Sequence, residues 1–178
     1  MGRGAKAPSS EQAYSRAMAL LDAAPRLPSL AVFDLDYTIW PTFCEFHSGR
    51  EECSVYPEVQ GILEALKAKG VKLAVASRSP TASVARAWLK KIDFERYFCS
   101  THIFSSSTNK TEHFQKIKSD TGVPYSEMIF FDDEDRNIHA INRIGVVAVD
   151  VSRRGTDVAA LKEALDRYGD KADESRGF

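Results

Sequence analysis

The stretch Leu30-Ala31-Val32-Phe33-Asp34-Leu35-Asp36-Tyr37-Thr38 decides the fold, because it joins a short apolar run to two closely spaced acids. An apolar run that ends in this way is typical of a strand buried on both faces. Similar runs follow at residues 71–76, 102–104, 128–131 and 146–149. Helical patterns separate them, at residues 57–69, 80–91, 110–120, 136–144 and 157–168. The alternation predicts an α/β, three-layer Rossmann-like fold in which a parallel five-stranded sheet carries helices on both faces.

Individual residues mark where the predicted helices begin and end. Pro57 stands at the first position of one helix and Gly70 follows its end, as these residue types prefer. Ser79 is expected to cap the helix that starts at Pro80, and Thr156 is expected to cap the last helix.

The chain is expected to divide into three segments. Residues 1–29 form an N-terminal extension, in which a disordered tail over residues 1–8 leads into a helix that packs on the main domain. Residues 30–170 form that main domain, and residues 171–178 form a C-terminal tail. The basic side chains of the extension resemble an organelle transit peptide only faintly, so a tail followed by a helix is the favoured interpretation.

The charges of the 178-residue chain nearly cancel, with 24 Lys and Arg against 25 Asp and Glu. This balance argues against a nucleic-acid partner, because it leaves no strongly basic surface. No apolar stretch reaches the roughly 18 residues that cross a bilayer, so no membrane association is expected. The three cysteines, Cys44, Cys53 and Cys99, are an odd number at irregular spacing. That favours a reducing, cytoplasmic location over a disulfide framework.

Polar side chains follow the predicted strands at the end where parallel sheets bind ligands. They are Asp34 and Asp36 after the first strand, Ser77 and Arg78 after the second, Lys110 after the third, and Asp132 and Asp133 after the fourth. Carboxylates that converge without a cation repel one another, and oxygen donors without histidine favour Mg²⁺. A carboxylate nucleophile, with a second carboxyl two residues on to act as acid and base, suits phosphoryl transfer.

These four stretches resemble, in order and separation, the four motifs of the haloacid dehalogenase (HAD) superfamily of phosphohydrolases. Together with Trp40-Pro41, Tyr56-Pro57-Glu58-Val59 and Phe130-Phe131-Asp132-Asp133-Glu134, they resemble its magnesium-dependent phosphatase-1 branch. The resemblance runs from about Leu30 to Tyr168. It implies a Mg²⁺-dependent phosphomonoesterase, with residues 30–170 as a HAD-like phosphatase domain.

The resemblance also implies which residues handle the phosphoryl group. Asp34 matches the nucleophile that becomes an aspartyl-phosphate, and Asp36 matches the general acid and base. The remaining matches contact or orient the phosphate or its loop: the N–H groups of Leu35 and Asp36, the hydroxyls of Thr38 and Ser77, and the cations of Arg78 and Lys110.

For the metal, the resemblance implies ligands from the first and fourth motifs. Asp34 contributes its other carboxylate oxygen, and Asp36 its main-chain carbonyl. Asp133 is favoured as the fourth-motif ligand because its spacing to Asn137 and Ile138 fits the family, while Asp132 binds directly or through water.

The segment between the first motif and the next helix is too short for the cap domain that this superfamily often inserts. It has 18 residues, from Ile39 to Tyr56. We therefore expect no large cap domain and an open site. Such a site admits a phosphorylated small molecule or a phosphoprotein, including phosphotyrosine and protein-linked sugar phosphates.

Three other functions use similar residues. A phosphomutase or phosphotransferase usually needs a cap to exclude water, which the short segment does not provide. A phosphoacceptor signalling domain lacks the acid and base two residues after the phosphorylated carboxylate, so Asp36 argues against it. A binding module without activity gains no support, because the reactive residues are all present.

Two features of the 39–56 segment carry alternative interpretations. Cys44, His47 and Cys53 suggest a zinc site, but three ligands at irregular spacing make this a minority interpretation. Trp40 and Phe43 either line the substrate entrance or close the core beneath the segment.

Overall fold

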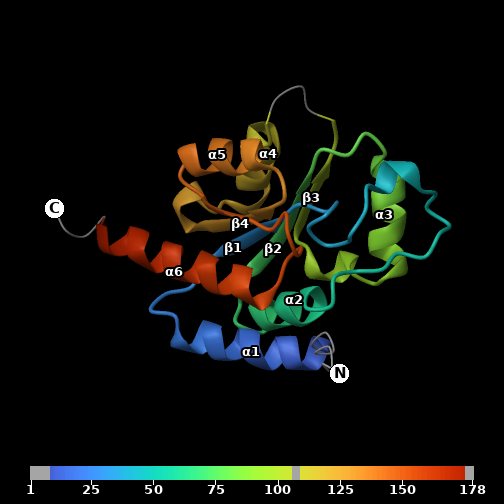
Figure 1. The fold of residues 1–178 in the computed structure, drawn as a ribbon. Helices are drawn as coiled ribbons and strands as arrows, with labels where there is room; N and C mark the ends of the chain where they lie inside the picture. The colour runs from blue at the N-terminus through green and yellow to red at the C-terminus, as the bar shows by residue number, and fades with distance from the viewer. Residues whose placement is uncertain (1–8, 106–108, 175–178) are drawn as a thin grey trace.

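The computed structural model describes residues 9–105 and 109–174, and these form one parallel five-stranded sheet with helices around it (Figure 1). The strands are β1 Leu30–Phe33, β2 Lys72–Ser77, β3 Ser100–Ile103, β4 Met128–Asp132 and β5 Val147–Asp150. Their order is β3-β2-β1-β4-β5, so β1 lies at the centre. Loops from both halves of the sheet therefore meet at the carboxyl end of β1, where ligands bind in such folds.

Six α-helices occur within the described ranges: α1 Ser10–Ala23, α2 Val59–Ala68, α3 Ala82–Lys91, α4 Thr111–Thr121, α5 Asp135–Arg143 and α6 Val158–Glu174. Short 3₁₀ turns also occur, at η1 Cys44–Phe46, η2 Glu95–Tyr97 and η3 Tyr125–Glu127. No helix in this part of the chain is long and apolar enough to span a membrane.

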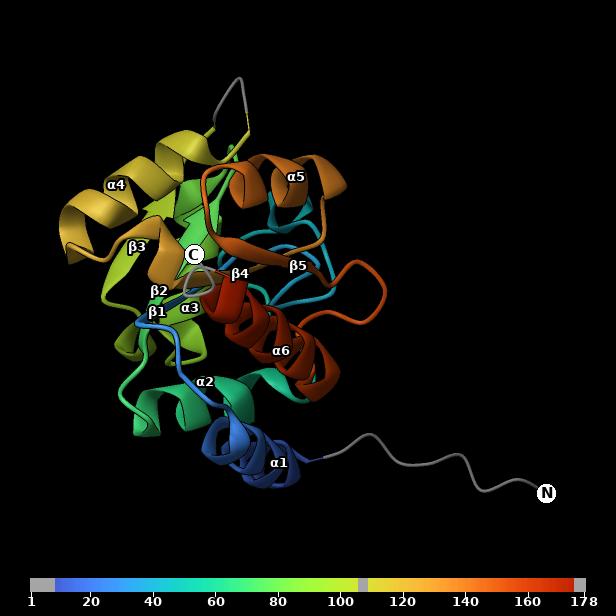
Figure 2. The same ribbon diagram turned by 90° about the vertical axis from the view of Figure 1, so that its left-hand side faces the viewer.

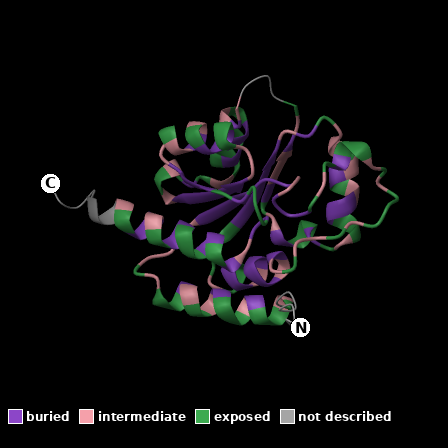
Figure 3. Cartoon of the chain, in the orientation of Figure 1, coloured by how far each residue is buried: buried purple, intermediate pink, exposed green. Residues whose placement is uncertain are grey.

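Alternate residues of β1 face opposite helical layers, as the pleat of a strand requires. Ala31 and Phe33 join the core that includes α2, α3 and α6, whereas Leu30 and Val32 join the core that includes α4 and α5. Figure 2 shows these helices on either side of the sheet, and Figure 3 shows buried strands between half-exposed helices. The predicted three-layer α/β fold is confirmed.

Helix α1 adds a further layer, because it packs on α2 and α6 rather than on the sheet (Figures 1 and 2). Its buried face is Ala13, Ala17 and Leu21. Ser9 and Gln12 form a capping box, in which each side chain bonds the other residue's backbone N–H. The helix expected in the extension is present; the tail over residues 1–8 lies outside the described residues.

Two helices begin two residues later than predicted. Pro57 lies in a turn before α2, where Glu58 accepts a 2.6 Å hydrogen bond from the Val158 N–H and so ties α2 to α6. Pro80 likewise precedes α3. Ser79 does not cap that helix; its hydroxyl accepts the Thr81 N–H at 3.2 Å.

The last helix differs from the prediction at both ends. Asp157 rather than Thr156 bonds its first turn, by accepting the Ala160 N–H at 2.8 Å. Thr156 instead donates its backbone N–H to the Thr38 carbonyl, which fastens this loop to the segment after β1. Helix α6 continues to Glu174, so residues 171–174 are helical although the sequence predicts a tail there.

We expect Gly61→Ala to loosen the packing of α1 on α2. A Cβ at Gly61 would lie 2.6 Å from the backbone nitrogen of Tyr14, so the two helices would have to separate. The free energy of unfolding should fall by about 1–3 kcal/mol, although alanine normally favours a helix. Chemical denaturation measures this loss. Gly169→Ala in α6 is the control, because its Cβ meets only Pro25, at 3.3 Å; an equal loss there would contradict the explanation.

Candidate active site

The carboxyl ends of β1, β2 and β4 and the start of α4 enclose a cavity of about 190 Å³. It is called the active-site cavity below. Its lining residues are Asp34, Asp36, Phe43, Glu45, Ser77, Arg78, Ser79, Pro80, Lys110, Asp133 and Glu134. The structure thus brings together most of the predicted site residues, because parallel strands end at the same edge of the sheet.

Lys110 joins two strands through a buried ion network. Its Nζ lies 2.5 Å from Asp34 Oδ1 and 2.5 Å from Asp132 Oδ2. The Lys110 and Asp132 side chains are 2% and 0% exposed. Burial alone would lower the pKa of Lys110, but the two carboxylates outweigh it and raise that pKa. Lys110 therefore stays charged, although one ammonium faces two carboxylates.

Asp34 is held through both of its carboxylate oxygens. Oδ1 accepts from Lys110, and Oδ2 accepts from the Thr38 hydroxyl at 3.3 Å. Burial, followed by the charges of Asp132 and Asp133, raises the pKa of Asp34 well above its usual value, against the effect of Lys110. Thr38 is fully buried and lies outside the cavity lining, so in this structure its hydroxyl orients Asp34 rather than facing a phosphate.

Asp132 and Asp133 are adjacent in the chain but differ in their surroundings. Asp132 accepts bonds from Lys110, from the Glu134 N–H at 2.7 Å and from the Asn137 amide at 3.2 Å. Asp133 lines the cavity, and burial followed by the charge of Asp132 raises its pKa to about 6. One ligand oxygen each from Asp34, Asp132 and Asp133 fall within 4.8 Å of one another, a spacing that could hold a cation.

Two backbone N–H groups follow the end of β1. Within residues 9–105 and 109–174, neither the Leu35 nor the Asp36 N–H has a hydrogen-bond acceptor. Leu35 is fully buried and does not line the cavity, whereas Asp36 does. Free N–H groups at a strand end are suited to an anion.

Arg78 and Glu134 cross the cavity wall from β2 to α5. Arg78 Nη2 lies 3.2 Å from Glu134 Oε2, and Arg136 Nε reaches the same oxygen at 2.6 Å. Glu134 was not among the predicted site residues. Its position two residues after Asp132 was the only available signal, and nothing in the sequence paired it with Arg78.

The structure also reveals two buried supporting residues that were not among the predicted site residues. Asn137 bonds both Asp132 oxygens from α5. His113 Nε2 lies 2.9 Å from the Ser77 carbonyl and 3.1 Å from that of Phe104, which fixes the end of β2. A polar residue on the apolar face of each predicted helix was the signal that could have identified them.

The zinc interpretation of Cys44, His47 and Cys53 gains no support. The His47 ring nitrogens are engaged by Thr42 at 2.9 Å and by Glu51 at 2.8 Å. Among the described residues, only the three aspartates form a group with metal-ligand spacing. Of the two alternatives for the aromatic residues, each applies to one of them. Trp40 is fully buried in the core, whereas Phe43 lines the cavity and is 41% exposed.

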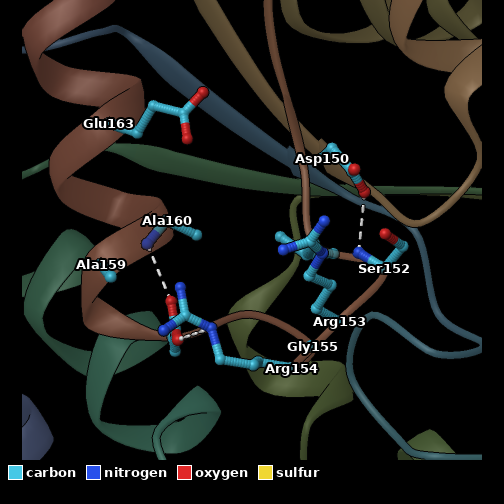
Figure 4. Close-up of a pocket in the computed structure, with 10 residues that line it drawn as sticks. Asp150, Ser152, Arg153, Arg154, Gly155, Ala159, Ala160 and Glu163 are labelled. Carbon is cyan, nitrogen blue, oxygen red and sulfur yellow. Dashed lines mark hydrogen bonds and ion pairs between the residues drawn. The ribbon is translucent and has the colours of Figure 1, made fainter.

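A larger cavity, of about 580 Å³, lies between the end of β5 and α6 (Figure 4). Several of its polar groups bond to other residues of the loop that lines it. Asp150 accepts the Ser152 N–H at 2.7 Å, and Arg154 pairs with Asp157 at 3.0 Å. It lacks the converging carboxylates and buried lysine of the smaller cavity, so size does not identify the reactive site here.

Comparisons with known proteins agree on one family. The profile of the acid phosphatase family matches residues 47–171. Magnesium-dependent phosphatase 1 of Homo sapiens is 37% identical over 158 residues, which cover 80% of this chain and 88% of that protein. A HAD-like hydrolase superfamily protein of Schizosaccharomyces pombe is 31% identical over 156 residues, covering 72% of this chain and 88% of its own.

Solved structures share the fold at low sequence identity. The phosphatase domain in the N-terminal part of a Bacteroides fragilis protein, complexed with Mg, has a TM-score of 0.64 at 16% identity; the match covers 84% of this chain and 43% of that one. A HAD-superfamily hydrolase of Ehrlichia chaffeensis has a TM-score of 0.61 at 10% identity, covering 82% and 99%.

His113 is expected to make the protein acid-sensitive. Burial lowers its pKa to about 4, from 6.5 in an unfolded chain, so the unfolded state binds the proton more tightly. The contribution of neutral His113 to stability is therefore present above about pH 6.5 and is lost towards pH 4, which amounts to roughly 3 kcal/mol.

The measurement is urea unfolding of wild type and His113→Gln between pH 4 and 7, at fixed Mg²⁺ concentration. Glutamine keeps a neutral donor but does not titrate. The difference in unfolding free energy between the two proteins should shrink as the pH falls. His139→Gln is the control, since His139 is exposed on α5. A difference that stays constant with pH would contradict the prediction.

Proposed function

The chain belongs to the acid phosphatase family within the HAD superfamily, and on that premise we propose that it hydrolyses phosphomonoesters through a phosphorylated Asp34. Its reaction class is phosphoric monoester hydrolysis, and its cofactor is Mg²⁺. One observation carries the mechanistic proposal. Asp34 is held by Lys110 and Thr38 at a cavity that also contains Asp36, two residues on.

The donor set fits Mg²⁺. Carboxylate oxygens without histidine suit this hard cation. Burial, followed by neighbouring carboxylates, raises the pKa values of Asp34 and Asp133, so a bound cation would favour their ionised forms. We assign the metal to the carboxylates of Asp34 and Asp133 and the Asp36 carbonyl, with Asp132 acting through water because, unlike Asp34 and Asp133, it does not line the cavity. When bound, the ion would neutralise charge shared by these carboxylates and the phosphate.

The residues of the cavity divide the work of binding. The N–H groups of Leu35 and Asp36 and the Ser77 hydroxyl are suited to donate to phosphate oxygens. Arg78 and Lys110 supply positive charge, and Glu134 sets the direction of Arg78 through their 3.2 Å contact. Positioning and charge neutralisation are the main requirements of phosphoryl transfer.

The reaction then takes place in two steps. In the first, an Asp34 oxygen attacks phosphorus, the bond to the leaving oxygen breaks, and Asp36 gives that oxygen a proton. In the second, Asp36 takes a proton from water as the water oxygen attacks phosphorus. The bond from phosphorus to Asp34 breaks, which regenerates the carboxylate and releases inorganic phosphate.

The open cavity favours hydrolysis of a phosphate carried by a bulky group. The 39–56 segment folds as a short loop with one 3₁₀ turn and provides no lid. Beside the cavity, Phe43 and Phe46 are 41% and 76% exposed, and their rings meet edge to face with centroids 5.9 Å apart. We therefore place phosphotyrosine ahead of sugar phosphates as the substrate. Free access of water disfavours the phosphotransferase and phosphomutase alternatives, which must protect the phosphoryl group.

Asp34→Asn should abolish turnover of p-nitrophenyl phosphate, by at least about 10³-fold, because the amide is a poor nucleophile. Asp150→Asn is the matched control. Asp150 pairs with Asp132 in the β4–β5 register but lies outside the active-site cavity. The activity of the Asp150→Asn variant should therefore stay near that of wild type. Thermal melting shows whether each variant is folded. Substantial turnover by folded Asp34→Asn would exclude the covalent mechanism.

Removal of the metal should abolish the phosphatase activity, and addition of Mg²⁺ should restore that activity. Asp133→Asn is expected to raise the Mg²⁺ concentration for half-maximal activity by about 10-fold or more, since one carboxylate ligand is lost. Titration of activity with Mg²⁺ after EDTA treatment and dialysis measures this. Recovery with Zn²⁺ but not with Mg²⁺, or an unchanged Mg²⁺ requirement in Asp133→Asn, would contradict the assignment.

A further inference from the structure

The Trp40 indole is bonded directly to Asp36. Trp40 is fully buried, and its Nε1 lies 2.6 Å from Asp36 Oδ1. The backbone N–H of Cys44 reaches the same oxygen at 3.1 Å. Hydrogen bonds from N–H groups to an ionised carboxylate are shorter and stronger than neutral ones. A buried indole N–H needs such a partner, so Trp40 has a structural reason to keep this contact.

Trp40 itself has little freedom to move. Its ring packs edge to face on Trp88, with centroids 5.3 Å apart, and Trp88 is buried as well. The backbone closes the same turn: the Tyr37 N–H donates to the Trp40 carbonyl at 2.7 Å, and the Trp40 N–H donates to the Leu35 carbonyl at 3.3 Å. The core therefore holds the donor whose N–H fixes the direction of the Asp36 carboxylate.

The two oxygens of Asp36 are consequently not equivalent. Oδ1 accepts two N–H donors, from Trp40 and Cys44. Among the described residues, Oδ2 has only the Cys44 thiol as a partner, at 3.7 Å, and a thiol is a weak donor. Oδ2 is thus the oxygen available to give a proton to a leaving group and to take one from water.

We propose that Trp40 is a positioning residue that anchors Oδ1 of Asp36 and so presents Oδ2 to the leaving oxygen of the substrate. The proposal rests on the function proposed above, because it assigns Asp36 as the general acid. The proposal predicts that the loss of Trp40 affects some substrates more than others. Leaving groups that depart readily as anions need little help from an acid, whereas poor leaving groups depend on it.

The first test compares Trp40→Phe with wild type on p-nitrophenyl phosphate, phenyl phosphate and an alkyl phosphate. Phenylalanine fills most of the space but lacks the N–H. The ratio of kcat/KM for p-nitrophenyl phosphate to that for phenyl phosphate should rise by roughly 10-fold, with most of the loss in kcat. Because the fraction of folded enzyme cancels in this ratio, partial unfolding of the variant cannot produce the effect.

Trp88→Phe is the matched control. Trp88 is also buried, and its indole N–H donates to the Ser48 carbonyl at 3.3 Å instead of to a catalytic group. Phenylalanine keeps an aromatic ring beside Trp40 and does not remove the Trp40–Asp36 hydrogen bond. This variant should therefore leave the substrate ratio within about 2-fold of wild type, even if all rates fall together. An unchanged ratio in Trp40→Phe, or the same shift in both variants, would overturn the proposal.

The second test does not depend on activity. In the Trp88→Phe background Trp40 supplies the one indole ¹⁵N–H signal of the chain, because the sequence has two tryptophans. Adding Asp36→Asn should move that signal, since the acceptor loses its charge. A signal that does not move would overturn the proposed contact. If wild type instead lacks Mg²⁺-dependent turnover while this signal does move, the proposed function fails and the contact stands.

Discussion

The buried bridge from Lys110 to Asp34 and Asp132 is the interaction on which the rest of the site depends. It joins the central strand β1 to β4 through the first residue before α4. Removing charges from water is costly unless each finds partners, so the three segments must arrive together. Thr38 and Asn137 complete the network by binding the remaining oxygens of the two carboxylates. The residues proposed to react are therefore also the residues that hold these three segments together.

The segment after β1 links the two proposed reactive carboxylates to the core. Asp34 is oriented from inside the fold, by Lys110 and Thr38, whereas Asp36 is oriented by a turn that closes on the buried Trp40. The same short segment leaves the cavity open, because it folds as a loop and not as a cap. Precise positioning and free access are thus achieved by one stretch of chain, whose inner side is buried and whose outer side carries Phe43 and Phe46.

Much of the fold could be predicted because apolar runs and helical periodicity are local signals. The strands, the helices and the gathering of Asp34, Ser77 and Lys110 at one edge follow from strand parallelism. Helix starts were less predictable. Two helices begin two residues after the prolines that were expected to start them, and Asp157 instead of Thr156 bonds the first turn of α6. Tertiary hydrogen bonds, such as Glu58 to α6, compete with local capping preferences at these positions.

The sequence by itself determined the class of fold and the kinds of groups at the site, since both depend on residue type and spacing along the chain. Only the tertiary structure decided how those groups pair. It places Asp132 on Lys110 and leaves Asp133 facing the cavity, although the two are neighbours in sequence. It also gives Asn137 and Trp40 their partners. Such pairings depend on side-chain directions and on contacts between distant segments, which linear spacing does not encode.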